Sequence, residues 1–212
     1  MNWLIITGGA APEHALLQER IRIADRVIAV DGAADLLAQA GVTPHVLIGD
    51  FDTASKTSIE ALVTGGTQIE RLPVHKNMTD TEAAMDYALN EGARDITMLG
   101  ALGTRVDHTL SNIGMLLRAH RRGVACRVLD DINELTVATG EYVLTGTPGQ
   151  TVSILPLTGD LVVTASGLLY PLEALALPFG SSRGVSNIMK STSAHLSISG
   201  DIALIVIILK NA

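Results

Sequence analysis

Short apolar runs and amphipathic stretches alternate along the N-terminal part of the chain. The apolar runs have the length and composition of buried strands and occur at residues 3–7, 26–30, 46–48, 69–72 and 96–99. Stretches with helical spacing of their apolar residues follow at 13–23, 36–40 and 55–63, and again after residues 80 and 107. Strands that alternate with helices in this way form a parallel sheet with helices on both faces. We therefore predict an α/β domain with a Rossmann-like sheet.

The pattern changes in the C-terminal part of the chain, where no helical period is present from Glu134 onward. Short runs rich in β-branched residues lie at 152–155, 161–164, 196–198 and 202–209. Turn-forming residues separate them at 147–149, 157–160 and 199–201. Short strands between such turns predict a sandwich or a barrel. We place the boundary so that residues 1–132 form the α/β domain and residues 133–212 form a β-rich domain.

Composition narrows the class of protein. The chain has 212 residues, of which 47% are hydrophobic, and its formal net charge is -7 without any block of Lys or Arg. We expect no nucleic-acid binding, because phosphate backbones require clustered positive charge. The N-terminus lacks the basic region of a signal peptide, and the apolar run at 202–209 is shorter than the ~20 residues of a membrane helix. We expect a cytoplasmic protein without membrane contact, in which the single cysteine, Cys126, is buried.

Three carboxylates follow two of the predicted strands directly. Asp31 follows the run at 26–30, and Asp50 and Asp52 follow the run at 46–48. In an extended segment Asp50 and Asp52 point to the same side, while Phe51 turns into the protein. Mg²⁺ is usually held by such carboxylates together with water and substrate phosphates. The alternative is local, with Asp50 ending a strand and Asp52, Thr53 or Ser55 capping the next helix. Because ligands bind at the carboxyl ends of parallel strands, we favour the metal site.

The loop before the predicted helix at residue 80 carries a second polar group. Lys76 could balance phosphate charge, or it could be a solvated surface lysine. Asp80 lies in the first turn of the helix, where it either interacts with the helix dipole or adds a metal contact. Thr79 and Glu82 have the spacing of a capping box, so Glu82 could serve only the helix start.

The loop at 100–108 combines glycines with charged residues. The glycines allow close approach of the backbone, and Arg105 can bind two phosphate oxygens at once. We predict that Asp107 is the N-cap of the next helix, and His108 is either a ligand contact or a surface group. The loop at Gly8 and Gly9 could also offer amides to phosphate, although neither a dinucleotide fingerprint nor a Walker A motif is present.

Taken in order, these motifs resemble those of the thiamine pyrophosphokinase family. The resemblance spans nearly the whole chain and rests on Asp31 to Ala34, Gly49 to Thr53, Thr79 to Glu82, Gly103 to His108, Phe179 with Gly180, and Val185 to Asn187. It implies an α/β nucleotide-binding domain followed by a β-sandwich that binds thiamine. It also implies a homodimer with active sites shared between subunits, and transfer of a pyrophosphoryl group from Mg-ATP to the thiamine hydroxyl with release of AMP.

The resemblance assigns a role to each candidate residue. Catalytic and metal-binding roles fall to Asp50, Asp52 and Asp80, with Arg105 as a further catalytic residue. ATP binding falls to Asp31, Gly32, Lys76, Arg105, Asp107 and His108. Thiamine binding falls to Tyr170, Ser186 and Asn187. The chain departs from the family pattern at Asn77, where an acidic residue is expected, and at Thr104, where a glycine is expected.

The implied chemistry is an in-line attack of the thiamine hydroxyl on the β-phosphorus of ATP. Catalysis of this kind consists mostly of positioning and charge stabilisation. Two alternatives remain open. One is a pyrophosphokinase acting on a pterin-like alcohol, which would share the acidic half of the site. The other is a non-catalytic sensor of nucleotide or thiamine, which would not need so many carboxylates beside a triphosphate.

Overall fold

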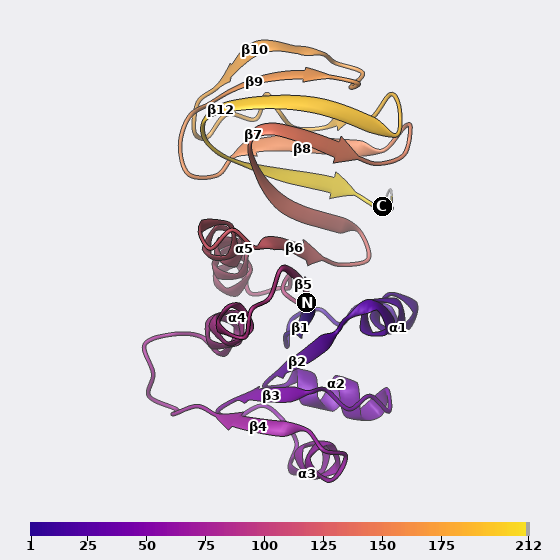
Figure 1. Ribbon diagram of the computed structural model, residues 1–212, viewed down its shortest axis with the longest axis vertical. Coiled ribbons are helices and arrows are strands. Elements are labelled where there is room, and N and C mark those ends of the chain that lie inside the picture. The colour runs from indigo at the N-terminus through magenta and orange to yellow at the C-terminus, as the bar shows by residue number, and fades with distance from the viewer. Residues whose placement is uncertain (211–212) are drawn as a thin grey trace. The chain divides into compact units, whose positions relative to one another are not determined.

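The computed structural model describes residues 1–210 and divides the chain into two compact units (Figure 1). The first unit runs from Met1 to Asp131, and the second begins at Ile132. The second unit is β-rich, whereas the first alternates strands and helices. Each unit has its own hydrophobic core.

The first unit is built on a parallel sheet of six strands. The order across the sheet is β6-β5-β1-β2-β3-β4. The strands are β1 (Asn2–Ile6), β2 (Arg26–Val30), β3 (Val46–Gly49), β4 (Gln68–Arg71), β5 (Asp95–Leu99) and β6 (Ala125–Leu129). The central strands are buried on both faces, and Ile5 and Ile28 are completely inaccessible. Near-continuous apolar runs are expected of such strands, so the predicted parallel sheet is confirmed.

Five helices cover the two faces of this sheet. They are α1 (His14–Ile23), α2 (Ala33–Gln39), α3 (Lys56–Thr64), α4 (Asp80–Asn90) and α5 (Val106–Arg121). Figure 1 shows α4 and α5 on one face and α1, α2 and α3 on the other. The buried cluster beneath α1 and α2 includes Leu17, Leu37 and Leu47. The helices therefore shield apolar surface on both sides of the sheet.

Two of the observed helix N-caps agree with the caps predicted from the sequence, and a third does not. Ser55 caps α3 by accepting a hydrogen bond from the Ser58 amide at 3.2 Å, and Thr79 caps α4 by accepting one from the Glu82 amide at 3.1 Å. The prediction that Asp107 caps α5 is wrong, because Arg105 occupies the N-cap position and Asp107 lies inside the first turn. An acidic residue is favourable at either position, so composition alone could not separate them.

The order of the strands creates a switch point at the centre of the sheet. The chain proceeds outward from β1 through β2 and β3 to β4, and then returns to place β5 on the other side of β1. The loops that follow β1 and β5 therefore leave the carboxyl edge of the sheet in opposite directions. Ligands of open α/β sheets bind in the crevice at such a point.

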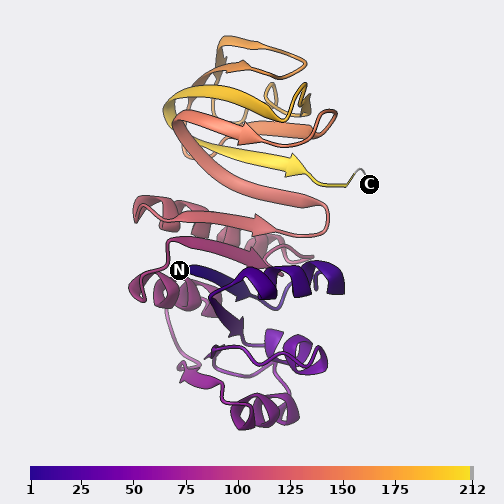
Figure 2. The ribbon, with the colours of Figure 1, turned by 45° about the vertical axis from the view of Figure 1, so that its right-hand side comes forward.

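The second unit consists of antiparallel strands that form two layers. The strands are β7 (Asn133–Thr145), β8 (Thr151–Pro156), β9 (Leu161–Ser166), β10 (Leu172–Leu177), β11 (Asn187–Ile188) and β12 (Ser193–Ile208). β12 pairs with β7 along its length, with β9 in its first half and with β8 in its second half. The antiparallel pair formed by β7 and β12 is therefore shared between the two layers, as Figure 2 shows.

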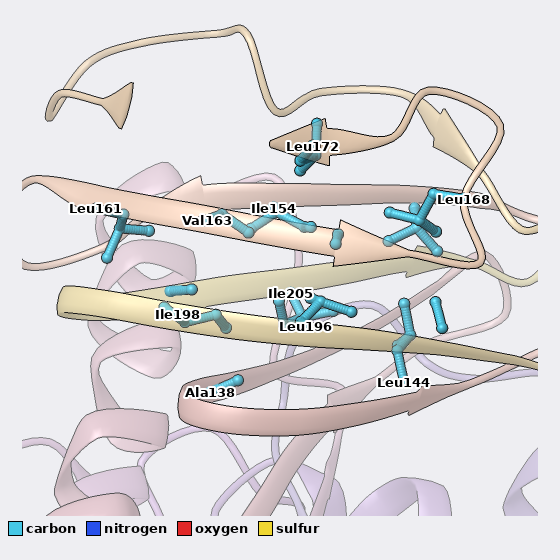
Figure 3. Close-up of a cluster of buried hydrophobic side chains, with 14 of the residues drawn as sticks. Ala138, Leu144, Ile154, Leu161, Val163, Leu168, Leu172, Leu196, Ile198 and Ile205 are labelled. Atoms are coloured by element: carbon cyan, nitrogen blue, oxygen red, sulfur yellow. The ribbon is translucent and has the colours of Figure 1, made fainter. Parts of the chain in front are cut away.

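The core of the second unit lies between these layers. Figure 3 shows side chains from both layers meeting in the interior, and they include Ile154, Leu161, Val163, Leu196, Ile198 and Ile205. All six are aliphatic, and each is at most 4% exposed. Alternation of such residues with exposed ones along β9 is the pattern of a sheet with one solvated face. The unit is thus the β-sandwich that the family resemblance implied.

One predicted turn in this unit is wrong. Residues 199–201 were expected to separate two strands, but β12 passes through them without ending. The pairing with β7 shifts between Ile198 and Ala203, and Gly200 adopts a φ of 94°. A glycine in this conformation is as suitable for a bulge as for a turn, and the bulge bends the strand from one layer to the other.

Among the residues that the structure describes, no helix is long and apolar enough to span a bilayer.

Candidate active site

A pocket of about 1060 Å³ lies in the first unit, beyond the carboxyl ends of the strands. Its walls come from the loops that follow β1, β2 and β5, from the segment before α4 and from the first turns of α5. Six of the residues expected to bind ATP or metal line it, and they are Asp31, Gly32, Lys76, Asp80, Arg105 and His108. The pocket therefore occupies the switch point where the fold predicts a ligand.

Two glycine-containing loops meet at the floor of this pocket. The Gly9 amide donates a hydrogen bond to the Gly100 carbonyl at 2.9 Å. A Cβ atom at Gly9 would lie 2.2 Å from the Gly100 oxygen and 2.7 Å from the Leu102 oxygen. Because backbone atoms form both contacts, no side chain could move aside to admit a larger residue. The loop after β1, which gave only a weak signal in the sequence, is thus fixed against the loop after β5.

Three carboxylates gather beside the pocket, and of these Asp31 lines it whereas Asp50 and Asp52 do not. Asp31, Asp50 and Asp52 each offer one oxygen, and these oxygens all lie within 4.8 Å of one another. Convergence of Asp50 and Asp52 was predicted from an extended segment, but that route is wrong because Phe51 has a φ of 65°. The Asp52 amide instead donates to Asp50 Oδ1 at 3.3 Å, so a tight left-handed turn brings the two side chains together.

A side chain of the neighbouring strand, β4, contacts the aromatic ring of this turn. Phe51 packs against the buried cluster of the first unit, as predicted, and the Arg71 guanidinium lies 4.7 Å from the centre of its ring. An Arg71 amino group also donates to the Asp50 carbonyl at 3.4 Å. A cation over an aromatic face is attracted by the ring quadrupole. Arg71 therefore stabilises the turn that carries the two carboxylates.

Lys76 forms an ion pair with two carboxylates at once. Its Nζ atom lies 3.0 Å from Asp50 Oδ2 and 3.1 Å from Asp80 Oδ1. The exposed fractions of the side chains are 13% for Lys76, 11% for Asp50 and 22% for Asp80, so solvent screens these contacts only partly. Lys76 thus joins the Asp50 turn to the start of α4.

The charges shift the pKa values of these groups in different directions. The hydrogen bond from Lys76 is the main reason that the pKa of Asp50 is lowered. The negative charge of Asp50 is the main reason that the pKa of Asp52 is raised, with smaller contributions from burial and from Asp31. Burial disfavours the charged form of Lys76, but the hydrogen bonds to Asp50 and Asp80 outweigh it and raise its pKa. The cluster therefore carries repulsion that a bound cation would relieve.

The composition of this cluster differs from the predicted set of metal ligands. Asp50 and Asp52 belong to it, whereas Asp80 lies on the other side of Lys76. Asp31, which was assigned to ATP, takes the third position in the cluster. Its Oδ1 atom is buried and accepts no hydrogen bond within the described residues. Such an atom is unusual in a folded protein and is typical of a ligand site.

Arg105, Asp107 and His108 lie at the start of α5. Arg105 Nε donates to Asp107 Oδ1 at 3.1 Å, and both side chains are about two-thirds exposed, at 69% and 65%. The hydrogen bonds from Arg105 lower the pKa of Asp107 to about 2. Arg105 and His108 line the pocket, whereas Asp107 neutralises Arg105 from outside it. Because this ion pair is exposed to solvent, Arg105 can exchange Asp107 for another anionic partner with little loss of free energy.

The three residues assigned to thiamine lie together in the second unit. Asn187 is 6% exposed and its amide group bonds to the backbone of Tyr170 in both directions, at 2.7 Å and 3.1 Å. Ser186 adopts a φ of 59°, and its amide donates to Ser153 Oγ at 3.1 Å. Tyr170 is 59% exposed. Asn187 therefore fixes the backbone that presents the Tyr170 ring to solvent.

The sequence did not reveal two residues that shape the pocket. Thr53 donates its hydroxyl hydrogen to Asp31 Oδ2. Asn112 is 7% exposed, lines the pocket and donates from Nδ2 to the Ala101 carbonyl at 2.7 Å. In the sequence, Thr53 indicates only a helix cap, and Asn112 stands among the apolar residues of a helix. A polar residue on the core-facing side of α5 was the only available signal.

Two family models match this chain. The model described as "Thiamin pyrophosphokinase, catalytic domain" matches residues 17–128, and the model described as "Thiamin pyrophosphokinase, vitamin B1 binding domain" matches residues 136–203. The chain belongs to the thiamine pyrophosphokinase family. The first match covers the pocket loops that follow β2 and β5, whereas β1 and the loop after it lie outside that match. The second match covers Tyr170, Ser186 and Asn187.

Individual members of the thiamine pyrophosphokinase family resemble the chain over most of its length. Thiamine pyrophosphokinase of Bacillus subtilis is 26% identical over 182 residues, covering 84% of this chain and 85% of that protein. Thiamin pyrophosphokinase 1 of Caenorhabditis elegans is 29% identical over 189 residues, covering 82% and 76%. The crystal structure of thiamin pyrophosphokinase from Geobacillus thermodenitrificans superposes with a TM-score of 0.84 at 27% identity, covering 100% of this chain and 99% of that one. These likenesses confirm the predicted family and fold class.

Proposed function

We propose that the pocket of the first unit binds ATP for transfer of its pyrophosphoryl group to the hydroxyl of thiamine. The products are thiamine diphosphate and AMP, and the chain is a thiamine diphosphokinase. The observation that carries this proposal is the cluster of Asp31, Asp50 and Asp52 at the carboxyl ends of β2 and β3, in a chain that both family models match. A pure sensor would not need three mutually repelling carboxylates beside its nucleotide pocket.

The carboxylate cluster fits Mg²⁺. Hard divalent cations prefer oxygen ligands, and Asp31, Asp50 and Asp52 offer three oxygens within 4.8 Å of one another. The buried Asp31 Oδ1 atom has no hydrogen-bond donor of its own among the described residues, as expected of a ligand oxygen. When bound, Mg²⁺ would supply positive charge to the phosphate groups. Asp80, which shares Lys76 with Asp50, would support the site from the start of α4.

Other residues of the pocket would bind and neutralise the triphosphate. Lys76 and Arg105 supply positive charge to the pocket. The other expected ATP contacts are Gly32 and His108, which line the pocket, and Asp107, which pairs with Arg105 from outside it. As the thiamine hydroxyl attacks the β-phosphorus, the bond to the α-phosphoryl oxygen breaks and AMP leaves. A carboxylate oxygen of the cluster accepts the hydroxyl proton. Catalysis then consists mainly of alignment and charge stabilisation.

The partner and the compartment are parts of the same proposal. We assign thiamine binding to Tyr170, Ser186 and Asn187, with the exposed Tyr170 ring available to stack on the flat cationic ligand. The family resemblance supports a homodimer with active sites shared between subunits. We also assign the protein to the cytoplasm.

The test is to incubate the purified protein with Mg-ATP and thiamine and to separate the products by chromatography. Equal amounts of AMP and thiamine diphosphate are expected. ADP together with thiamine monophosphate would place the attack at the γ-phosphorus and refute the mechanism. A protein that binds both ligands without turnover would be a sensor, and competition by pterins without competition by thiamine would indicate the other acceptor class.

A further inference from the structure

Thr53 holds the carboxylate of Asp31 in a single orientation. Its hydroxyl donates to Asp31 Oδ2. The other oxygen, Oδ1, is buried and accepts no hydrogen bond within the described part of the chain. The two oxygens of one carboxylate are therefore used differently, because Oδ2 is fixed by Thr53 while Oδ1 is left for a ligand. A hydrogen-bonded partner of this kind orients a metal-ligating carboxylate.

The surroundings of this pair leave little room for another arrangement. Asp31 adopts a φ of 45°, and its amide donates to the Ile48 carbonyl at 2.9 Å. A Cβ atom at Gly49 would lie 3.1 Å from Asp31 Cβ, and a Cβ atom at Gly32 would lie 3.0 Å from Thr53 Oγ1. Both glycines therefore allow Asp31 and Thr53 to meet. A strained backbone conformation of this kind persists only where its surroundings enforce it.

We infer that Thr53 is a positioning residue for the metal site, which acts by aiming Asp31 Oδ1 at the cation shared with Asp50 and Asp52. This inference rests on the proposed function. Thr53 contacts neither the reacting atoms nor the metal in this scheme, and its effect passes through Asp31. Loss of such an outer partner typically weakens metal binding by roughly 10- to 100-fold.

The test measures metal binding directly, with Mn²⁺ as the probe and the free ion followed by electron paramagnetic resonance. Thr53→Val keeps the shape of the side chain but removes the hydroxyl, and we expect its Mn²⁺ affinity to fall by about 10-fold or more. Thr53→Ser keeps the hydroxyl and should bind within about threefold of the wild type. Thr64→Val is the matched control, because among the described residues its exposed hydroxyl bonds only to the Glu60 carbonyl at 2.8 Å, within α3.

A second variant perturbs the same contact without removing the hydroxyl. Gly32 has a φ of -57°, which alanine adopts freely, so Gly32→Ala should fold. Its added methyl group would press on Thr53 Oγ1 and should weaken Mn²⁺ binding in the same direction as Thr53→Val. In steady-state assays Thr53→Val should raise the Mg²⁺ concentration for half-maximal rate much more than it changes the KM for thiamine. A uniform loss of rate alone would point to a structural role and count against the inference.

The outcomes separate this inference from the proposed function. If neither Asp50→Asn nor Asp52→Asn weakens Mn²⁺ binding relative to the wild type, the proposed metal site is wrong, and the role of Thr53 is then wrong as well. If binding requires these carboxylates but Thr53→Val binds as tightly as the wild type, only the role of Thr53 is wrong. Equal losses in Thr53→Ser and Thr53→Val would also overturn it, since the hydroxyl would then not matter.

Discussion

Replacing Asn112 by alanine should destabilise the loop that forms the floor of the pocket. Asn112 is 7% exposed and its Nδ2 atom donates to the Ala101 carbonyl at 2.7 Å. Ala101 is itself only 3% exposed, so water cannot readily replace the lost donor. A buried carbonyl left without a partner costs about 1–3 kcal/mol, and we expect Asn112→Ala to lower the free energy of unfolding by this amount. Stability of about 5–15 kcal/mol would leave the variant folded.

The size of this effect can be checked by urea denaturation, followed by circular dichroism, at pH 7. Asn90→Ala is the matched control, because Asn90 is exposed and accepts only a 3.3 Å hydrogen bond from Arg122, and it should change stability by less than about 0.5 kcal/mol. Asn112→Asp should be worse than Asn112→Ala, since it places a carboxylate opposite the Ala101 oxygen in a buried position. If Asn112→Ala unfolds at the same urea concentration as the wild type, the hydrogen bond does not hold the loop.

Four further predictions concern single ionisable groups. Asp52→Asn should abolish turnover while its thermal unfolding stays close to that of the wild type. Turnover near the wild-type rate would show that Asp52 does not belong to the metal site. Asp25→Asn, at the amino-terminal edge of the sheet, is the control variant. Lys76→Met leaves Asp50 without its main hydrogen-bond donor, so a carbon-13 titration of that carboxyl group should show a higher pKa, and an unchanged value would refute the contact. Burial lowers the pKa of His45 below 6.5, so stability should fall as pH drops below 6.5, and His45→Asn should reduce this dependence in denaturation series at pH 7 and 5.5. Burial raises the pKa of the Cys126 thiol to about 12, so it should react with Ellman's reagent at pH 8 only after unfolding, and immediate reaction would contradict its burial.

The sequence predicted the first unit well, because the signals that identify a parallel sheet are local. Apolar runs bounded by glycine and aspartate marked the strands, and the observed strands agree with them to within a residue or two at each end. The fold rule that ligands bind at the carboxyl ends of such strands then brought Asp31, Asp50 and Asp52 to one place. Their closeness follows from topology, and it did not require knowledge of the side-chain geometry.

Other parts of the site depended on contacts between segments that are distant in the sequence. The left-handed turn at Phe51, the hydrogen bond between Thr53 and Asp31, and the position of Asp80 across Lys76 arise only when neighbouring loops pack together. The spacing of apolar residues along the sequence does not predict such contacts. In the second unit, the glycine at residue 200 indicated a turn equally well as a bulge, and the pairing of β12 with two different layers decided between them.

The long antiparallel pairing of β7 with β12 also has a consequence for how the protein folds during synthesis. β7 begins the second unit and β12 ends it, and Asn133 pairs with Ile208. The first unit is complete once β6 has left the ribosome, so its core can form early. In the second unit, β7 cannot pair until β12 has been synthesised, and β8 and β9 in the two layers also pair with β12. Until then its apolar strands have unpaired edges, so the second unit is where nascent chains are most exposed to aggregation.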